Sequence, residues 1–273
     1  MTGQLNYMAS PEMVRPALLV GWRGDAGNLG ERTVSYFNQT LSLKPLAGIE
    51  PVGFFPLTGV EVSNDLARLP DSRFYYSETA PIITLLSDIP SYEVHGFLKL
   101  VLNLAARFVV SHVVVLGGLA TMASHNTPSQ LLANLSTPLL KEWLSGDGIN
   151  TEIDYVSPPG QKPAIATYLT WEAQQRGIEA VSLWLPVPFY LAPFNDEGGA
   201  ARLLSFFRQK LALPINSEPV AEAAAKQRQK LAALRSSTAD VEKYLNMLES
   251  NLSLTEYEAG ALAAAVRQEL AAE

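Results

Sequence analysis

Two short segments of the sequence carry residues that could bind or act on a ligand. GWRGDAGN, at 21–28, follows an apolar run typical of a buried strand and precedes a helix-like segment. A Gly-rich turn between a strand and a helix presents backbone N–H groups, which can bind phosphate. SHNT, at 124–127, follows HVVVLGG, the clearest buried strand. Because ligands of open α/β sheets bind beyond the carboxyl ends of the strands, we expect both segments at one crevice.

The candidate crevice residues lie at or just after the ends of predicted strands. They are Trp22, Gly24, Asp25, Gly27, Asn28, Ser87, Ser124, His125, Asn126, Thr127 and Tyr190. A ligand would meet backbone N–H groups first and His125 second, and an imidazole can serve as a general base or a hydrogen-bond donor. The competing interpretation is structural: glycines reverse the chain, and Asp25 or Asn28 caps the helix that begins near Leu29. We expect the turn to be mainly architectural.

The motifs of several enzyme classes are missing from the sequence. The glycine spacing fits neither the dinucleotide fingerprint nor the phosphate-binding P-loop, and the nucleophile-elbow and HExxH patterns do not occur. Three histidines far apart in the chain predict no metal site, and Arg23 is the only cation that the two crevice segments supply. We therefore predict no catalytic residue, no metal and no cofactor. The alternative is a small-molecule-binding protein, or a hydrolase or phosphorylase-like enzyme with its crevice at the C-terminal edge of the sheet.

The composition narrows the class of partner. The chain has 273 residues, a formal net charge of −7 and no cysteine. An acidic chain without a Lys/Arg run lacks the basic footprint that nucleic acids need. The sequence shows no signal peptide and no apolar segment of membrane-spanning length. We expect a soluble cytoplasmic protein that binds neither nucleic acid nor membrane.

Strand and helix patterns alternate along most of the chain. Strands are predicted at 17–20, 49–55, 73–77, 82–86, 112–116, 151–156 and 180–185, the fifth of them ended by Gly117 and Gly118. Helices are predicted at 28–43, 92–108, 129–144, 164–176 and 198–211. This alternation predicts an α/β fold with a largely parallel or mixed sheet flanked by helices.

The character of the sequence changes after Pro219, where Ala, Lys, Gln, Glu and Leu dominate. Helices are predicted at 221–234 and 241–248, and a capping box at 253–256 opens a third towards Leu270. We expect a loose N-terminal leader at 1–14, an α/β body at 15–217 and a C-terminal helical segment at 218–273. Apolar surface on the body or on the Ala- and Leu-rich helices favours self-association.

Three stretches together resemble one family. They are GWRGDAGN at 21–28, PSYEVHGFLKLVLNLAARFVVSHVVVLGGLATMASHNTP at 90–128, and GIEAVSLWLPVPFY at 177–190. In this order they resemble the PAC-two family, named after the second proteasome assembly chaperone. The resemblance implies a body like the purine nucleoside phosphorylase fold, followed by C-terminal helices. Eukaryotic and archaeal relatives assist proteasome assembly as oligomeric chaperones, and many bacterial members have no assigned activity. The resemblance therefore implies a protein partner and a homo-oligomer, a trimer or a tetramer.

The chain departs from the family pattern at points that bear on binding. Members often carry His-Thr-Arg-Pro where this chain has His125-Asn126-Thr127-Pro128, so an arginine that could meet an anion is missing there. Archaeal members can end in a hydrophobic-Tyr-any tail that docks on the proteasome, whereas this sequence reads ELAAE at 269–273. We do not expect docking through such a tail.

Overall fold

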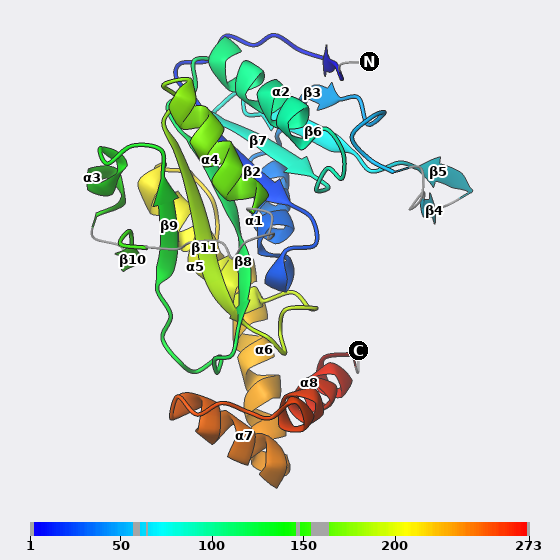
Figure 1. The fold of residues 1–273 in the computed structure, drawn as a ribbon, viewed down its shortest axis with the longest axis vertical. Coiled ribbons are helices and arrows are strands. Elements are labelled where there is room, and N and C mark those ends of the chain that lie inside the picture. The colour runs from blue at the N-terminus through cyan, green and yellow to red at the C-terminus, as the bar shows by residue number, and fades with distance from the viewer. Residues whose placement is uncertain (1–2, 57–60, 64, 146–147, 154–163, 272–273) are drawn as a thin grey trace. The chain divides into compact units, whose positions relative to one another are not determined.

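The computed structural model describes residues 3–56, 61–63, 65–145, 148–153 and 164–271 (Figure 1). The chain forms two compact units. The first contains Met1–Gly24, Val34–Leu116 and Leu132–Leu183, and the second contains Asp25–Thr33, Gly117–Leu131 and Trp184–Glu273. Among the described helices, none is long and apolar enough to cross a membrane.

A mixed sheet of nine strands dominates the first unit, in the order β1-β3-β6-β7-β2-β8-β11-β9-β10. Its strands are β1 (Leu5–Tyr7), β2 (Ala17–Trp22), β3 (Lys44–Ile49), β6 (Ser72–Tyr76), β7 (Ile82–Ser87), β8 (Val113–Thr121), β9 (Leu131–Leu135), β10 (Ile149–Asn150) and β11 (Ala180–Pro188). The last residues of β8 and β11 and the first residue of β9 belong to the second unit. A separate hairpin joins β4 (Glu61–Ser63) to β5 (Leu66–Arg68).

The centre of the sheet is parallel and its β1 side is antiparallel. β2 pairs in parallel with β7 and with β8, and every residue of β2 is buried. A strand buried on both faces explains the continuous apolar run in the sequence. β7, β6, β3 and β1 then pair antiparallel in turn.

Helices cover both faces of the sheet in the first unit. α2 (Val94–Arg107) and α4 (Ile165–Gln175) lie together on one face (Figure 1), where Arg176 Nη1 donates to Asn103 Oδ1 at 2.9 Å. On this face Phe97 of α2 contacts Trp22 of β2, with ring centroids 6.2 Å apart. Thr84 of β7 pairs with Leu19, an odd number of residues from Trp22, and therefore points to the opposite face, where it donates to Asn38 of α1 (Leu29–Thr40) at 2.6 Å. α3 (Leu140–Leu144) is a short helix of the same unit.

The second unit is mainly helical. It contains α5 (Glu197–Lys210), α6 (Glu218–Ser237), α7 (Ala239–Glu249) and α8 (Glu256–Ala271), of which α6, α7 and α8 pack against one another. α8 begins with a capping box: Thr255 Oγ1 accepts from Glu258 N at 3.3 Å, and Glu258 Oε2 accepts from Thr255 N at 3.0 Å. The expected box at 253–256 is therefore displaced by two residues.

The expected α/β class with a mixed sheet is confirmed, and most predicted elements overlap observed ones. Three predictions are wrong. The expected strand at 49–55 lies earlier, as β3, because Phe54 N donates to Pro51 O and turns the chain. The expected helix at 129–144 is β9 followed by α3, since Leu131 and Ala133 alternate onto a buried face. Gly117 and Gly118 lie inside β8 and do not end it.

Two further expectations are affected at their edges. Of the strand expected at 151–156, residues 151–153 are not in a strand and residues 154–156 lie outside the described ranges. The nearest observed strand is β10, which ends at Asn150. Part of the expected leader, Leu5–Tyr7, forms β1 and pairs with β3. The boundaries of the leader, the body and the helical segment stay a prediction.

Phe97 is the aromatic centre of the α2 face. Its ring is fully buried and contacts Phe54 and Phe55 as well as Trp22, at centroid distances of 5.2 and 6.1 Å for the two phenylalanines. We expect Phe97→Ala to lower the free energy of unfolding by about 3–5 kcal/mol, because the cavity adds to the lost transfer energy. Denaturant unfolding followed by tryptophan fluorescence measures this. Tyr92→Ala, at an exposed position, is the control. Equal effects of the two substitutions would contradict this account.

Candidate functional site

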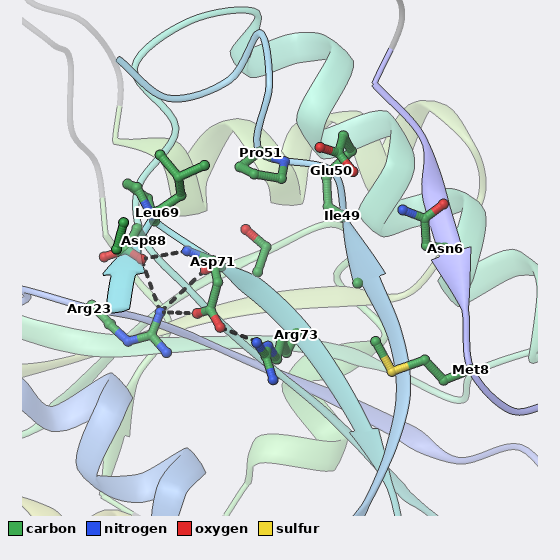
Figure 2. A pocket seen from close by; sticks show the side chains of 14 residues that line it. Asn6, Met8, Arg23, Ile49, Glu50, Pro51, Leu69, Asp71, Arg73 and Asp88 are labelled. Atoms are coloured by element: carbon green, nitrogen blue, oxygen red, sulfur yellow. Dashed lines mark hydrogen bonds and ion pairs between the residues drawn. The ribbon is translucent and has the colours of Figure 1, made fainter. Parts of the chain in front are cut away.

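A groove of about 990 Å³ lies in the first unit (Figure 2). It lies over the sheet face opposite α2, at the end of the sheet formed by β1, β3 and β6. Asn6 of β1, Met8 just after it and Arg73 of β6 are exposed, whereas Phe74, one position along β6, is fully buried. This part of the face is therefore open to solvent.

An ion-pair network occupies one side of this groove. Arg23 Nη1 lies 3.0 Å from Asp71 Oδ1 and 3.0 Å from Asp88 Oδ2. Asp71 also pairs through Oδ2 with Arg73 Nε at 2.8 Å, as Figure 2 shows. The four side chains are between about a quarter and three fifths exposed, so solvent screens each pair. The consequence for the groove is that Arg23 and Arg73 are both already paired with carboxylates.

Apolar side chains and a further carboxylate complete the groove. Met8 is 61% exposed and Leu69 is 46% exposed, and both line the cavity. Glu50 lines it as well and has no ion-pair partner among the described residues. The lining thus holds three carboxylates, from Glu50, Asp71 and Asp88, against the two arginines 23 and 73. A surface that mixes exposed apolar groups with a small excess of negative charge suits a polypeptide better than a small anion.

Asp25 fixes the Gly-rich turn in the second unit. Its carboxylate accepts from Gly30 N, at 3.0 Å to Oδ2, and from Gly118 N, at 2.6 Å to the same oxygen. Of the two caps expected for the helix that begins near Leu29, Asp25 or Asn28, the cap is Asp25, because Gly30 lies in the first turn of that helix. Burial raises the pKa of Asp25 to about 6, against the opposing effect of these N–H groups.

Two glycines allow the turn to approach the end of β8. A Cβ at Gly118 would lie 1.8 Å from Ala26 O, so no other residue fits without moving the backbone. Gly27 has a φ of +72°, and a Cβ there would lie 2.9 Å from the Asp196 side chain. Gly117 and Gly118 are therefore glycines inside β8 because a side chain at either position would meet residues of the turn.

His125 and Tyr190 form a neutral hydrogen-bonded pair in the second unit. Tyr190 Oη accepts from His125 N at 2.9 Å and lies 2.8 Å from His125 Nδ1. One proton lies between these two atoms, and it comes from the phenol or from the imidazole according to the tautomer of His125. Burial lowers the pKa of His125 and raises the pKa of Tyr190 to about 12. Such a pair is suited to holding the loop in place.

Glu249 ties the same loop to the C-terminal helices. Its Oε1 accepts from Ser124 Oγ and Asn126 Nδ2, both at 3.0 Å, and pairs with Arg235 Nη1 at 2.9 Å. Although burial raises the pKa of Glu249, these donors lower it below its ordinary value. Ser124 therefore donates to a carboxylate whose lowered pKa makes it a weak base for activating a nucleophile.

The predicted crevice residues belong to both units. Ser124, His125 and Thr127 line a second, smaller cavity in the second unit, while Asn28 Nδ2 donates to Asn195 Oδ1 at 3.0 Å. Trp22 and Ser87 are buried in the first unit and line neither cavity, and Gly24, Asp25, Gly27, Asn28, Asn126 and Tyr190 also line neither. Which of these residues bind a ligand stays a prediction.

Sequence reasoning missed two arginines. Arg202 of α5 and Arg228 of α6 line the smaller cavity with the 124–127 segment. Arg23, expected as the only cation of the crevice, is held instead by two carboxylates. Arg202 and Arg228 lie 75 or more residues beyond the loop, inside helices whose polar faces give no sign of a site. Only the tertiary structure shows that these two arginines line the same cavity as the 124–127 segment.

Comparison with known proteins places the chain in a family. The model of the PAC2 family matches residues 18–235. A comparison with curated proteins found no match. Among solved structures, PbaB of Pyrococcus furiosus, an archaeal proteasome activator, is 20% identical with a TM-score of 0.68, covering 86% of this chain and 99% of that chain. Rv2714 of Mycobacterium tuberculosis, of unknown function, is 20% identical with a TM-score of 0.77, covering 98% and 92%.

These likenesses show the fold, and the family match covers well over half of the chain. A Corynebacterium glutamicum protein of unknown function agrees with them, with a TM-score of 0.77, 18% identity and coverage of 92% of this chain and 96% of that chain. The chain belongs to the PAC2 family, and the resemblance stated from its sequence is confirmed.

Asp25 gives a testable pH dependence. Because its pKa is raised from 3.8 to about 6, the native state binds this proton more tightly than the unfolded chain does. Its contribution to stability is therefore least favourable above about pH 6 and improves as the pH falls towards about 4. We expect the stability of the wild type relative to Asp25→Asn to rise over this interval. Denaturant unfolding at a series of pH values measures the difference in the free energy of unfolding between the two proteins. Titration of the histidines cancels in this difference, because both proteins contain them.

Asp25→Ala is the companion variant. It leaves Gly30 N and Gly118 N without their acceptor and should cost about 1–3 kcal/mol. A wild-type curve parallel to that of Asp25→Asn, together with an unchanged stability of Asp25→Ala, would show that the carboxylate does not fix the turn.

Proposed function

We propose that this PAC2 family protein binds another protein as an assembly-chaperone-like factor and is not an enzyme. The family match supports a chaperone-like role, and two of the similar structures are described as an archaeal proteasome activator and an archaeal homolog of proteasome-assembly chaperone. The protein would work in the cytoplasm, without nucleic acid or membrane as a partner. The identity of its partner, proteasomal or other, is what the experiments below address.

The observation that carries this proposal is the open groove of the first unit. Met8 and Leu69 expose apolar surface there beside Glu50, whose charge has no partner among the described residues. A partner segment with an apolar side chain next to a lysine or arginine would satisfy both features. The two arginines of the groove are already paired, so a negatively charged segment gains little.

The hydrogen bonds of the second unit support a non-catalytic role. The His125 imidazole is engaged by Tyr190, and the Ser124 hydroxyl is engaged by Glu249. Neither side chain faces the other as a nucleophile and its base would. The alternative, a small-molecule-binding or phosphorylase-like activity, would require turnover that disappears in His125→Ala.

Site-specific photo-crosslinking tests the groove. With a photoreactive amino acid at position 8 or 69, we expect one partner protein to be captured from both positions in the native host. Leu139, 76% exposed on a different part of the first unit, is the control position. Capture of that partner from position 139 with equal yield, or crosslinks to this chain alone from positions 8 and 69, would contradict the proposal.

Two substitutions sharpen the same test. Gly48→Leu should fill the floor of the groove, since a Cβ there meets only Ser72 O at 3.7 Å and Met8 Cε at 3.9 Å. Glu50→Lys reverses the unpaired charge. We expect each to reduce the crosslink several-fold, and Glu152→Lys, an exposed acidic position elsewhere in the unit, to leave it unchanged. Unchanged capture by both groove variants would place the partner elsewhere.

We also propose that the chain forms a closed homo-oligomer, a trimer or a tetramer, through its C-terminal helices. Tyr257 at the start of α8 is 82% exposed, and Leu252 before it is 56% exposed. Light scattering at about 10 µM, a working range for such interfaces, should give three or four times the monomer mass. Tyr257→Asp should shift the mass towards the monomer, whereas Tyr92→Asp should not. A monomeric wild type would refute self-association.

A further inference from the structure

A small cavity in the second unit contains an arginine, Arg202, that has no counter-charge among the described residues. The cavity has a volume of about 170 Å³ and lies between the 121–129 segment, the end of β11, and helices α5 and α6. Its size admits about five water molecules, and hence a small ion or metabolite and not a nucleotide. It is separate from the groove of the first unit and shares no lining residue with it.

Arg202 is the central group of this cavity. Its Nη1 donates to Ser129 O and, at 3.2 Å, to Ser129 Oγ, which are neutral acceptors. Burial lowers the pKa of the guanidinium, and no carboxylate among the described residues pairs with it. A partly buried charge is costly unless an opposite charge or several hydrogen bonds compensate it. The remaining guanidinium nitrogens are therefore suited to receive an anion in the planar, two-pronged geometry that arginine favours.

Two further side chains point to the same class of ligand. Thr127 lines the cavity, and its Oγ1 is buried without a hydrogen-bond partner among the described residues. Buried hydroxyls are nearly always hydrogen-bonded, so this atom has the capacity to donate to a bound oxygen. Arg228 of α6, an exposed residue, brings a second positive charge to the lining.

Asp196 is the one carboxylate among the lining residues, and it is already in use. Its Oδ1 accepts from Gly199 N at 2.9 Å and so caps α5, and burial raises its pKa. The lining therefore carries two arginines against one carboxylate that is held by backbone donors, within a chain whose net charge is −7. The local excess of positive charge runs against the charge of the whole chain.

We propose that this cavity binds a small oxyanion, a phosphate or a short carboxylate, through Arg202, with Thr127 and Arg228 as additional contacts. The ligand neutralises Arg202 and occupies a space bounded by both α6 and the loop that Glu249 holds. Binding should therefore stabilise the second unit without any chemical change in the ligand. The proposal does not depend on the groove or on a protein partner.

Calorimetric titration and thermal unfolding test the site, with inorganic phosphate and malonate as separate probes and sodium chloride at matched ionic strength as the reference. We expect one probe or both to bind the wild-type chain with a Kd on the order of 1 mM or tighter and to raise Tm. The two arms distinguish a phosphate from a carboxylate ligand. No binding of either probe at about 10 mM, ten times that Kd, would overturn the proposal.

Variants assign the binding to this cavity. Arg202→Gln should weaken binding at least tenfold, and Arg208→Gln, an exposed arginine of the same helix that does not line the cavity, should bind as the wild type does. Thr127→Val is a second probe that does not depend on the fold tolerating a change at Arg202. It removes an unpartnered hydroxyl, so it should leave the ligand-free protein no less stable and yet weaken binding. Binding that survives both Arg202→Gln and Thr127→Val would place the anion elsewhere and refute the assignment.

Discussion

The carboxylate of Asp25 is the contact on which the Gly-rich turn depends. One oxygen accepts N–H groups from Gly30 and from Gly118, residues 88 positions apart in the chain. Two other amides of the turn are also used, since Gly27 N donates to Ala192 O and Asn28 N to Asp25 O. A phosphate would need these same N–H groups. The turn thus resembles an anion site in its sequence, while acceptors of the protein itself already bind the N–H groups of Gly27 and Asn28.

The groove and the small cavity, one in each unit, differ in their chemistry. In the groove, Arg23 and Arg73 are paired with aspartates, whereas the carboxylate of Glu50 has no ion-pair partner among the described residues. In the small cavity the relation is reversed, because the carboxylate of Asp196 caps a helix and Arg202 has no counter-charge in the described part of the chain. The group left unpaired predicts the charge of the occupant. Size supports the same division, since about 990 Å³ admits a peptide segment and about 170 Å³ admits a small ion.

Glu249 gives the second unit its internal order. It is the last residue of α7, and it receives hydrogen bonds from Arg235 of α6 and from Ser124 and Asn126 of the loop. A single carboxylate therefore holds two helices and the loop together. Leu231 of α6 and Ser124 both line the small cavity, so its shape follows from this contact. The polar residues of the loop, which read as a possible catalytic group, serve largely to bind the C-terminal helices.

Local patterns were sufficient for the elements whose burial is uniform. The run at Ala17–Val20 is apolar at every position because β2 is buried on both faces, and the period of α2 matches its buried stripe. The sequence also identified Asp25 as one of two candidate caps, with Asn28, since the acceptor and the helix it caps are neighbours in the chain. Prediction was wrong where pairing with a distant strand outweighed local preference, as in β9, and where two distant segments approach closely, as at Gly118.

By itself, the sequence determined the α/β class, the family and the capped turn, because each depends on patterns of residues that are close together along the chain. Only the tertiary structure decided which charges are left unpaired. Arg23 proved to be neutralised by Asp71 and Asp88, and Arg202 proved to have no such partner among the described residues. The availability of a charge for binding depends on its partners and on its removal from water, and both are set by residues tens of positions away.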